Sequence, residues 1–307
     1  MGTQLSKKVT FVICTENGIL ESRSLVLCSS LRKFGGRFKD APVLSYSPRV
    51  GKRPHLQTLK ALEKLNVTPI LKNLNKKYLE YPVANKILAA ADAEANVKSD
   101  FLVFLDSDMV MVNEPTELLM KCGNQVALVP AWDKCASSTG PDDPNDAYWM
   151  ELYSFLNVKE EIFINPSVHA PRPIRAYWNS GMISARCESG VFTKWLENFE
   201  KCWARKLFPR LAYHMDEATL AGTLLSQFPR QIQELPRSYN FPMCQYRNKS
   251  GLRSMNEAVL LHYYKLLGRN LLQVREYFKM WFPRAITSEK ELWLREQFRQ
   301  MVWQSVK

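Results

Sequence analysis

Two carboxylates follow the most apolar stretch of the chain, and their spacing suits a metal ion. Phe-Leu-Val-Phe-Leu at 101–105 is followed by Asp106, Ser107 and Asp108. Side chains two positions apart on extended backbone point to the same side, so both carboxylates can offer oxygen ligands to one Mg²⁺ or Mn²⁺ ion. Such an ion keeps positions open for phosphate oxygens and can neutralise a diphosphate leaving group. The alternative is a turn whose aspartates accept backbone N–H groups, but adjacent carboxylates repel each other without a cation.

The segments around this motif predict an α/β fold. Short apolar runs alternate with helical patterns, which is typical of a parallel sheet covered by helices on both faces. The run 101–105 is apolar at every position and is therefore expected at the centre of the sheet. Ligands bind such sheets at the carboxyl ends of the strands, where Asp106 and Asp108 stand. The expected strands are 9–14, 43–46, 67–71, 101–105 and 126–129. Helices are expected over 56–65 and 85–95, and a further helix is expected to end at Gly35.

Composition sets the class of protein. The chain has 307 residues, 46% of them hydrophobic and 23% charged, which predicts a globular protein with one elaborated core. Seven cysteines without a C-x-x-C pair argue against a zinc cluster or a disulfide scaffold and favour buried thiols in a reducing compartment. There is neither an apolar run of membrane-spanning length nor the apolar core of a signal peptide, so we expect a cytoplasmic protein.

The net charge of +12 is unevenly distributed. Residues 1–80 have a net charge of +10 and residues 263–307 of +5, which leaves the middle of the chain at −3. No signature of nucleic-acid recognition accompanies this charge, so no nucleic-acid partner is expected. A nucleoside diphosphate or peripheral contact with an anionic membrane explains the basic ends as well. The basic, apolar stretch 263–282 predicts a helix docked on the core, with an active-site lid or a membrane-surface helix as alternatives.

Several segments resemble one enzyme family. Phe-Leu-Asp-Ser-Asp at 104–108 resembles the D-x-D signature of GT-A-fold, nucleotide-sugar-dependent glycosyltransferases. Further segments are similar to those of glycogenin-like members, which are related to family eight, and they occur in the expected order across roughly residues 9–265. The sequence is most similar to one group of these enzymes. This similarity indicates the fold and the type of reaction more firmly than it indicates the substrate. The segments are Tyr-Trp-Asn-Ser-Gly-Met-Ile at 177–183, His-Met-Asp-Glu-Ala-Thr-Leu at 214–220, Leu-Pro-Arg-Ser-Tyr-Asn at 235–240 and the late His262.

The resemblance implies a fold and a reaction. The fold is GT-A, a Rossmann-like mixed sheet, with a core over 1–262 and a C-terminal helical extension over 263–307. The implied reaction is that of a hexosyltransferase, which moves a sugar from a nucleoside diphosphate sugar, a UDP-sugar as first choice, to an acceptor hydroxyl. The expected cofactor is Mn²⁺ or Mg²⁺. Glycogenin-like enzymes also suggest that the configuration of the sugar is retained.

The resemblance also assigns roles to individual residues. Asp106, Asp108 and His262 are the expected metal ligands, and Asp216 and Glu217 are the expected catalytic carboxylates, with Asp216 as first choice for orienting the donor sugar or stabilising an oxocarbenium charge. The expected donor-binding residues are Thr15, Asn17, Lys86, Asp106, Ser107, Asn179, Ser180, Gly181 and Lys265.

Each assignment has a structural alternative. His262 could be a hydrogen-bonded core residue, 179–181 a turn, and Asp216 or Glu217 a helix cap. Glu217 stands where Gln is usual, which leaves open which carboxylate acts. Lys265 is displaced from its position in the family pattern. Lys86 could be a solvated surface residue, and Trp132 and Asp133 could contact the acceptor or, for Trp132, pack in the core.

Two other functions are compatible with parts of the sequence. Asp106 to Val110 also fits the nucleophile strand of haloacid-dehalogenase-like phosphatases, but those enzymes have this motif near the chain start and a later Gly-Asp-x-x-x-Asp pair, neither of which is present. The non-enzymatic alternative is a basic membrane-surface or interaction protein that retains the fold without catalysis.

Overall fold

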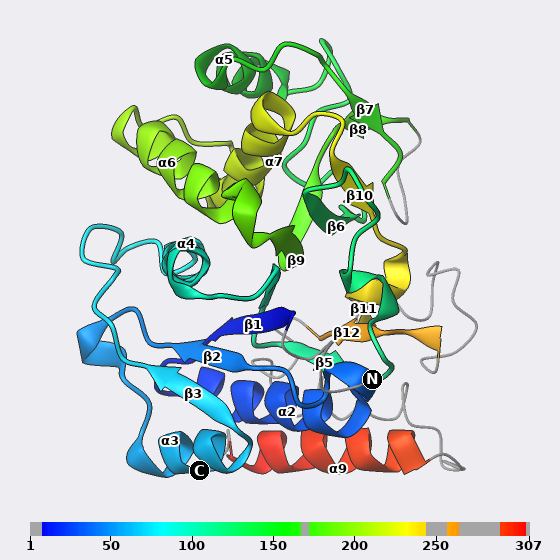
Figure 1. Ribbon diagram of the computed structural model, residues 1–307. Helices are drawn as coiled ribbons and strands as arrows, with labels where there is room; N and C mark the ends of the chain where they lie inside the picture. Colours follow the sequence, from blue (N-terminus) through cyan, green and yellow to red (C-terminus); the bar gives the residue numbers. More distant parts are fainter. Residues whose placement is uncertain (1–7, 167–171, 244–256, 264–288, 305–307) are drawn as a thin grey trace.

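The computed structural model describes residues 8–166, 172–243, 257–263 and 289–304 (Figure 1). Within these ranges the largest sheet has seven strands in the order β10-β6-β9-β4-β1-β2-β3. The strand β4 lies at its centre, as its uninterrupted apolar sequence predicts. The bounds are β1 Val9–Cys14, β2 Val43–Tyr46, β3 Val67–Ile70, β4 Phe101–Leu105, β6 Val126–Pro130, β9 Trp178–Arg186 and β10 Ile232–Glu234.

One strand, β9, runs opposite to the other strands of this sheet. The strands β3, β2, β1 and β4 are parallel, as the alternation of strands and helices predicts. The strand β9 runs antiparallel between β4 and β6, so a wholly parallel sheet is wrong, whereas the mixed sheet of the GT-A fold is confirmed. Hydrophobic periodicity indicates which face of a strand is buried but not the direction in which the strand runs, so it could not predict β9.

Helices cover both faces of the sheet (Figure 1). In β4, Leu102 and Phe104 join the hydrophobic core formed with α4, α6 and α7. The alternate residues Phe101, Val103 and Leu105 join the core formed with α2 and α3. Burial on both faces therefore fixes the strand that precedes Asp106. The bounds are α2 Ile19–Phe34, α3 Leu56–Lys64, α4 Ala84–Asn96, α5 Asp146–Leu156, α6 Val191–Ala204, α7 Met215–Gln227 and α9 Glu289–Gln304.

A smaller sheet brings the late histidine to the aspartates. Its strands are β11 (Phe241–Pro242), β12 (Leu260–His262) and β5 (Met109–Met111). The antiparallel register pairs His262 with Met109, the residue after Asp108. A two-stranded sheet of β7 (Phe163–Ile164) and β8 (Ile174–Arg175) lies elsewhere. Short 3₁₀ helices are η1 Gly36–Phe38, η2 Val50–Lys52, η3 Thr116–Leu118, η4 Cys187–Ser189, η5 Ala212–His214 and η6 Arg237–Asn240.

The helical C-terminal region is confirmed by α9, which lies along α2 (Figure 1). Phe34 and Trp293 meet edge to face with ring centroids 5.2 Å apart, and Phe298 contacts Tyr263 in the same way. The stretch 264–282, for which we predict a docked helix, lies outside the described residues, and the domain boundary at 262 stays a prediction. In the described part of the chain, none of the helices has the length and apolar character needed to cross a membrane.

Candidate active site

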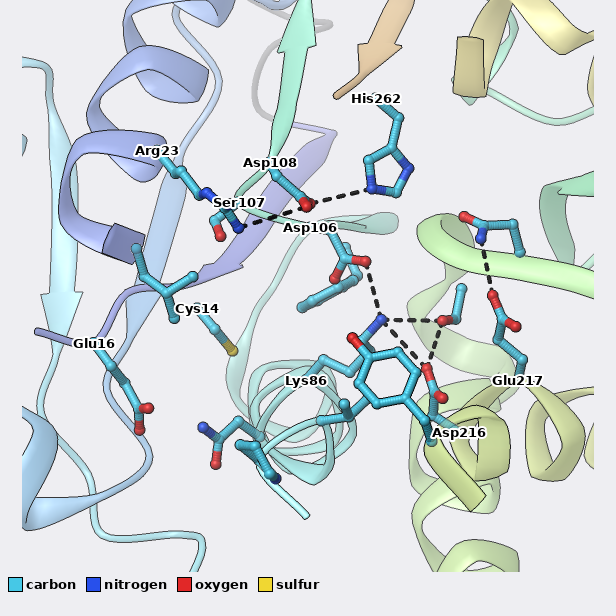
Figure 2. Close-up of a pocket in the computed structure, with 18 of the residues that line it drawn as sticks. Cys14, Glu16, Arg23, Lys86, Asp106, Ser107, Asp108, Asp216, Glu217 and His262 are labelled. Atoms are coloured by element: carbon cyan, nitrogen blue, oxygen red, sulfur yellow. Dashed lines mark hydrogen bonds and ion pairs between the residues drawn. The ribbon is translucent and has the colours of Figure 1, made fainter. Parts of the chain in front are cut away.

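A cavity of about 520 Å³ lies where β1 and β4 end (Figure 2). This is the edge at which parallel sheets bind ligands, and the volume suits a small molecule. Although the chain is basic overall, acidic groups outnumber basic ones on the cavity wall. A cation in the cavity would offset this excess. The acidic groups are Glu16, Asp106, Asp108, Asp216 and Glu217; the cationic ones are Arg23, Arg49, Lys86 and, with its raised pKa, His214, and the imidazole of His262 also lines the cavity.

Asp106, Asp108 and His262 form one cluster at this cavity. Asp106 leaves β4 with its N–H donating to the carbonyl of Gly181 (2.7 Å), and Asp108 directly precedes β5. The Nε2 atom of His262 lies 3.1 Å from Oδ1 of Asp108. One ligand atom from each of the three residues lies within 4.8 Å of the others. Two carboxylates and an imidazole are a donor set that fits Mn²⁺ or Mg²⁺.

A chain of amide hydrogen bonds fixes the tautomer of His262. The backbone N–H of Gly181 donates to Oδ1 of Asn179 (2.9 Å), so this atom is an acceptor, and the Nδ2 group of Asn240 donates to it as well (2.6 Å). The Oδ1 atom of Asn240 must then accept the Nδ1 proton of His262 (2.8 Å). In a neutral ring, Nε2 therefore presents its lone pair to the carboxylate of Asp108. Two acceptors 3.1 Å apart need a proton or a cation between them.

The two aspartates differ in their electrostatics. Burial raises the pKa of Asp106 above its ordinary value, Lys86 opposes this only in part, and nearby Asp108 adds to the rise. Burial also acts on Asp108, but His262 and the guanidinium of Arg23, 3.7 Å away, outweigh it and hold its pKa at about 2. A divalent cation would favour the ionised form of both carboxylates.

Lys86 connects the aspartate cluster to α7. Its ammonium group lies 3.0 Å from Oδ2 of Asp106 and 3.3 Å from Oδ2 of Asp216, and it donates to Ser180 (3.0 Å). Burial lowers the pKa of an ammonium group, but these carboxylates hold the pKa of Lys86 above its ordinary value. Lys86, whose side chain is 11% exposed, is therefore a largely enclosed cation inside the site and not a solvated surface residue (Figure 2).

The two acids at the start of α7 are held by side chains from other elements. Asp216 accepts hydrogen bonds from Tyr81 (3.0 Å) and Ser180 (2.7 Å). Glu217 accepts one from Asn179 (2.8 Å), and its other oxygen contacts the hydroxyl of Tyr177 and Nδ1 of His214. Neither acid forms a side-chain cap of α7. Both carboxylates line the cavity, and contacts with residues distant in the sequence hold them there (Figure 2).

The segment 179–181 is part of β9, so the alternative of an isolated turn is wrong. A side chain at Gly181 would lie 2.9 Å from His262 and 3.2 Å from Asp106. The first distance is shorter than real Cβ contacts and the second is tighter than most of them, so a side chain here would displace His262, which explains why glycine stands here. Asn179 and Ser180 line the cavity, and Gly181 does not. Donor binding by these three residues stays a prediction.

Some predicted site residues lie elsewhere. Thr15 is fully buried and bonds Ser24 and Ser45, and neither Thr15 nor Asn17 lines the cavity, although Glu16 between them does. Trp132 and Asp133 do not line it either. Ser107 does line it, and Lys265 lies outside the described residues.

Other residues of the site were not predicted. Arg23, Tyr81 and Asn240 contact the predicted acids and His262, yet nothing in their local sequence separates them from ordinary helix or turn residues. His214 lies next to both Cys135 and Glu217. Burial lowers the pKa of His214, but its hydrogen bonds with Cys135 and Glu217 outweigh this and raise the pKa to about 10. Asn240 and His214 lie inside the segments that resemble the family, and this resemblance is the only sequence feature that could have pointed to them.

Comparison with known proteins identifies the class. The WbbM bifunctional glycosyltransferase matches with a TM-score of 0.56 and 15% identity, over 94% of this chain and 51% of that one. The galactosyltransferase LgtC, solved with donor and acceptor sugar analogs, matches with a TM-score of 0.53 and 9% identity, over 96% and 95%. The fold is thus that of GT-A glycosyltransferases, and this chain spans about half the length of WbbM.

The family follows from the sequence itself. A family model described as the Rhodobacterales glycosyltransferase domain matches residues 11–224. The chain belongs to this family and is a glycosyltransferase, which confirms the predicted enzyme class. No match to a curated protein was found in the sequence comparison. Family and fold together give the phosphatase alternative no support.

Proposed function

We propose that this enzyme is a metal-dependent hexosyltransferase that moves a sugar from a nucleoside diphosphate sugar, with a UDP-sugar as first choice, to an acceptor hydroxyl. The single observation that supports the metal is the cluster of Asp106, Asp108 and His262, whose ligand atoms lie within 4.8 Å of one another at the cavity. Asp106, Asp108 and His262 would hold Mn²⁺ or Mg²⁺. The bound ion would supply charge neutralisation for the diphosphate as it leaves. The cytoplasmic location stays a prediction.

The protein's own groups orient the reactants. The relay through Asn240 keeps Nε2 of His262 directed at the aspartates, and Lys86 holds Asp106 and Asp216 at the same ammonium group. Asp216, fixed by Tyr81 and Ser180, is our first choice for the acid beside the transferred sugar. A fixed carboxylate there would stabilise positive charge that develops at the anomeric carbon.

The two acids on α7 would act on the sugar, since both line the cavity that the metal cluster also lines. Glu217, where the family pattern has Gln, would share this role with Asp216. We also propose retention of configuration, which follows the resemblance to glycogenin-like enzymes. NMR of the product tests this. A product with the inverted anomeric configuration would contradict retention but would leave the proposal of a metal site unaffected.

Replacing Asp108 with Asn tests the metal site. The wild-type chain should be stabilised against thermal unfolding by a nucleoside diphosphate with Mn²⁺ and much less without it. Asp108→Asn should weaken Mn²⁺-dependent nucleotide binding by more than about tenfold, because loss of even an outer-shell partner costs metal sites about 10–100-fold. A calorimetric titration measures this affinity, and circular dichroism shows whether the variant is folded.

The matched control is Asp100→Asn, since this acid is 59% exposed and lies outside the cavity. It should bind Mn²⁺ and nucleotide as the wild type does. Unchanged Mn²⁺-dependent affinity in folded Asp108→Asn would contradict the proposal. A panel of nucleoside diphosphates and their sugars, each with and without Mn²⁺, identifies the donor by the largest shift in melting temperature.

A further inference from the structure

A second group of metal-ligand side chains lies beside the cavity. Cys135 comes from the loop after β6, His214 ends η5, and Glu217 lies in the first turn of α7. One ligand atom from each lies within 4.8 Å of the other two. This cluster shares no residue with the aspartate cluster, but it includes Glu217, so an ion bound here would leave Asp216 as the acid beside the sugar.

The distances suit tetrahedral coordination. The Sγ atom of Cys135 lies 3.3 Å from Nε2 and 3.7 Å from Nδ1 of His214, and Nδ1 lies 2.9 Å from Oε2 of Glu217. A zinc ion bound to sulfur at about 2.3 Å and to nitrogen at about 2.0 Å would separate the two ligand atoms by about 3.5 Å. Because one ion binds a single ring nitrogen, Nδ1, which is near both partners, would be the ligand, and its 3.7 Å from Sγ is close to the separation that one shared ion would impose.

The backbone presents the thiol at this place. Cys135 has a φ of +41°, in the left-handed region that residues other than glycine rarely adopt. Its loop is closed by a hydrogen bond from the N–H of Ser137 to the carbonyl of Lys134 (2.7 Å), and Lys134 forms an ion pair with Asp143 (3.0 Å). The conformation that directs Sγ to His214 is therefore maintained by contacts on both sides of the cysteine.

We propose that Cys135, His214 and Glu217 form a second metal site, selective for a soft divalent cation such as Zn²⁺. Thiolate and imidazole ligands favour Zn²⁺, whereas the carboxylate-rich cluster of Asp106 and Asp108 suits Mn²⁺ or Mg²⁺. On binding, the thiol of Cys135 and the imidazolium of His214 would each release a proton to solvent, and Glu217 would turn from accepting a hydrogen bond of His214 to ligating the ion.

The fourth position would face the cavity. Cys135 and His214 are half-buried, and both His214 and Glu217 line the cavity. A bound cation would thus leave room for water or another ligand from that side, as open zinc sites do. The sequence argued against a zinc cluster because the cysteine spacing is irregular, yet the fold brings together ligands that are 79 residues apart in the chain. Regular spacing detects only sites built from short segments.

Cobalt tests the ligands directly, because Co²⁺ can replace Zn²⁺ and a thiolate ligand gives it a near-ultraviolet charge-transfer band. The experiment uses the reduced, metal-free full-length chain. Wild type should show this band with Co²⁺, Cys135→Ser should lose it, and the exposed thiol control Cys122→Ser should keep it. Asp108→Asn should also keep it, so failure of the aspartate site and of this site are distinguishable. A missing wild-type band, or a band that persists in Cys135→Ser, would overturn the proposal.

A second measurement needs no variant. Zn²⁺ should slow alkylation of Cys135 in the wild-type chain, because the free thiolate is the nucleophile and a metal-bound sulfur is withheld from the reagent. Alkylation of Cys122 in the same sample should be unaffected. Peptide mass spectrometry measures both rates at once. Equal rates at Cys135 with and without Zn²⁺ would show that the cluster is only a hydrogen-bonded thiol, and would overturn the site.

Discussion

At the scale of single residues, the site combines groups that the sequence indicates with groups that only the fold reveals. Asp106 and Asp108 follow a buried strand and stand out by their spacing, and His262 stands at the end of an apolar run. Asn240 and Tyr81, in contrast, matter because of what they contact across the fold. A side-chain hydrogen bond between residues far apart in the chain leaves no local pattern, so the sequence could not predict the relay that orients His262.

Asn240→Ala tests that relay. Without the amide acceptor, Nδ1 of His262 loses its partner and the ring can rotate or exchange its tautomer. We expect the affinity for Mn²⁺ to fall by about 10–100-fold, which is the usual cost of losing an outer-shell partner. Calorimetry measures it, with the exposed Asp133→Asn as the control expected to match wild type. Wild-type affinity in Asn240→Ala would mean that the tautomer of His262 is fixed by other contacts.

At the scale of elements, the sequence predicts most helices and strands but not how they are joined. The strand β4 and the helix α4 appear within a residue or two of the expected bounds, because a fully apolar run and an alanine-rich run have few alternative structures. The junction of α2 and α3 depends on Glu21. This side chain accepts hydrogen bonds from the backbone N–H of Gly18 (3.0 Å) and of His55 (2.7 Å) and from Thr58 (2.8 Å).

Glu21→Gln should therefore destabilise the fold in a pH-dependent way. Burial opposes ionisation of Glu21, but the hydrogen bonds from His55, Thr58 and Gly18 outweigh it and lower the pKa below its ordinary value of 4.5. A lowered pKa means that the stabilisation is complete above the ordinary pKa and is lost as the pH falls through the folded-state pKa. We expect a loss of about 1 kcal/mol in the free energy of unfolding near neutral pH, as for other helix caps.

Urea unfolding of both proteins at several pH values measures this difference. It should stay constant from about pH 7 down to about 4.5 and shrink below that, because protonation then removes the advantage of the carboxylate. Glu63→Gln, an exposed acid in α3, is the matched control and should differ little from wild type at any pH. A difference for Glu21→Gln that does not change with pH would contradict ionisation as the cause.

At the scale of the whole molecule, α9 supports the site through Tyr263. Among the described side chains of α9, Leu294, Phe298 and Met301 are buried, and Phe298 packs edge to face on Tyr263 with centroids 5.2 Å apart. Tyr263 follows His262, and its N–H donates to the carbonyl of Asp108 (3.1 Å). Through Tyr263, the packing of α9 therefore affects the positions of both His262 and Asp108.

Phe298→Ala should weaken this support. Removing a buried aromatic side chain leaves a cavity and costs about 3 kcal/mol in the free energy of unfolding. Mn²⁺ affinity should fall as well, because Tyr263 loses its packing partner. Chemical unfolding and calorimetry measure the two effects. Leu292→Ala on the same helix is the control, since Leu292 is 51% exposed and should change stability by less than about 0.5 kcal/mol.

The pairing of β12 with β5 also has a consequence for biosynthesis. His262 lies 154 residues after Asp108, so a nascent chain contains both aspartates long before their imidazole partner has left the ribosome. Until β12 is translated and takes its place beside β5, the emerging polypeptide has only the carboxylate ligands of the proposed metal site. Assembly of the three proposed ligands therefore waits for the synthesis of β12.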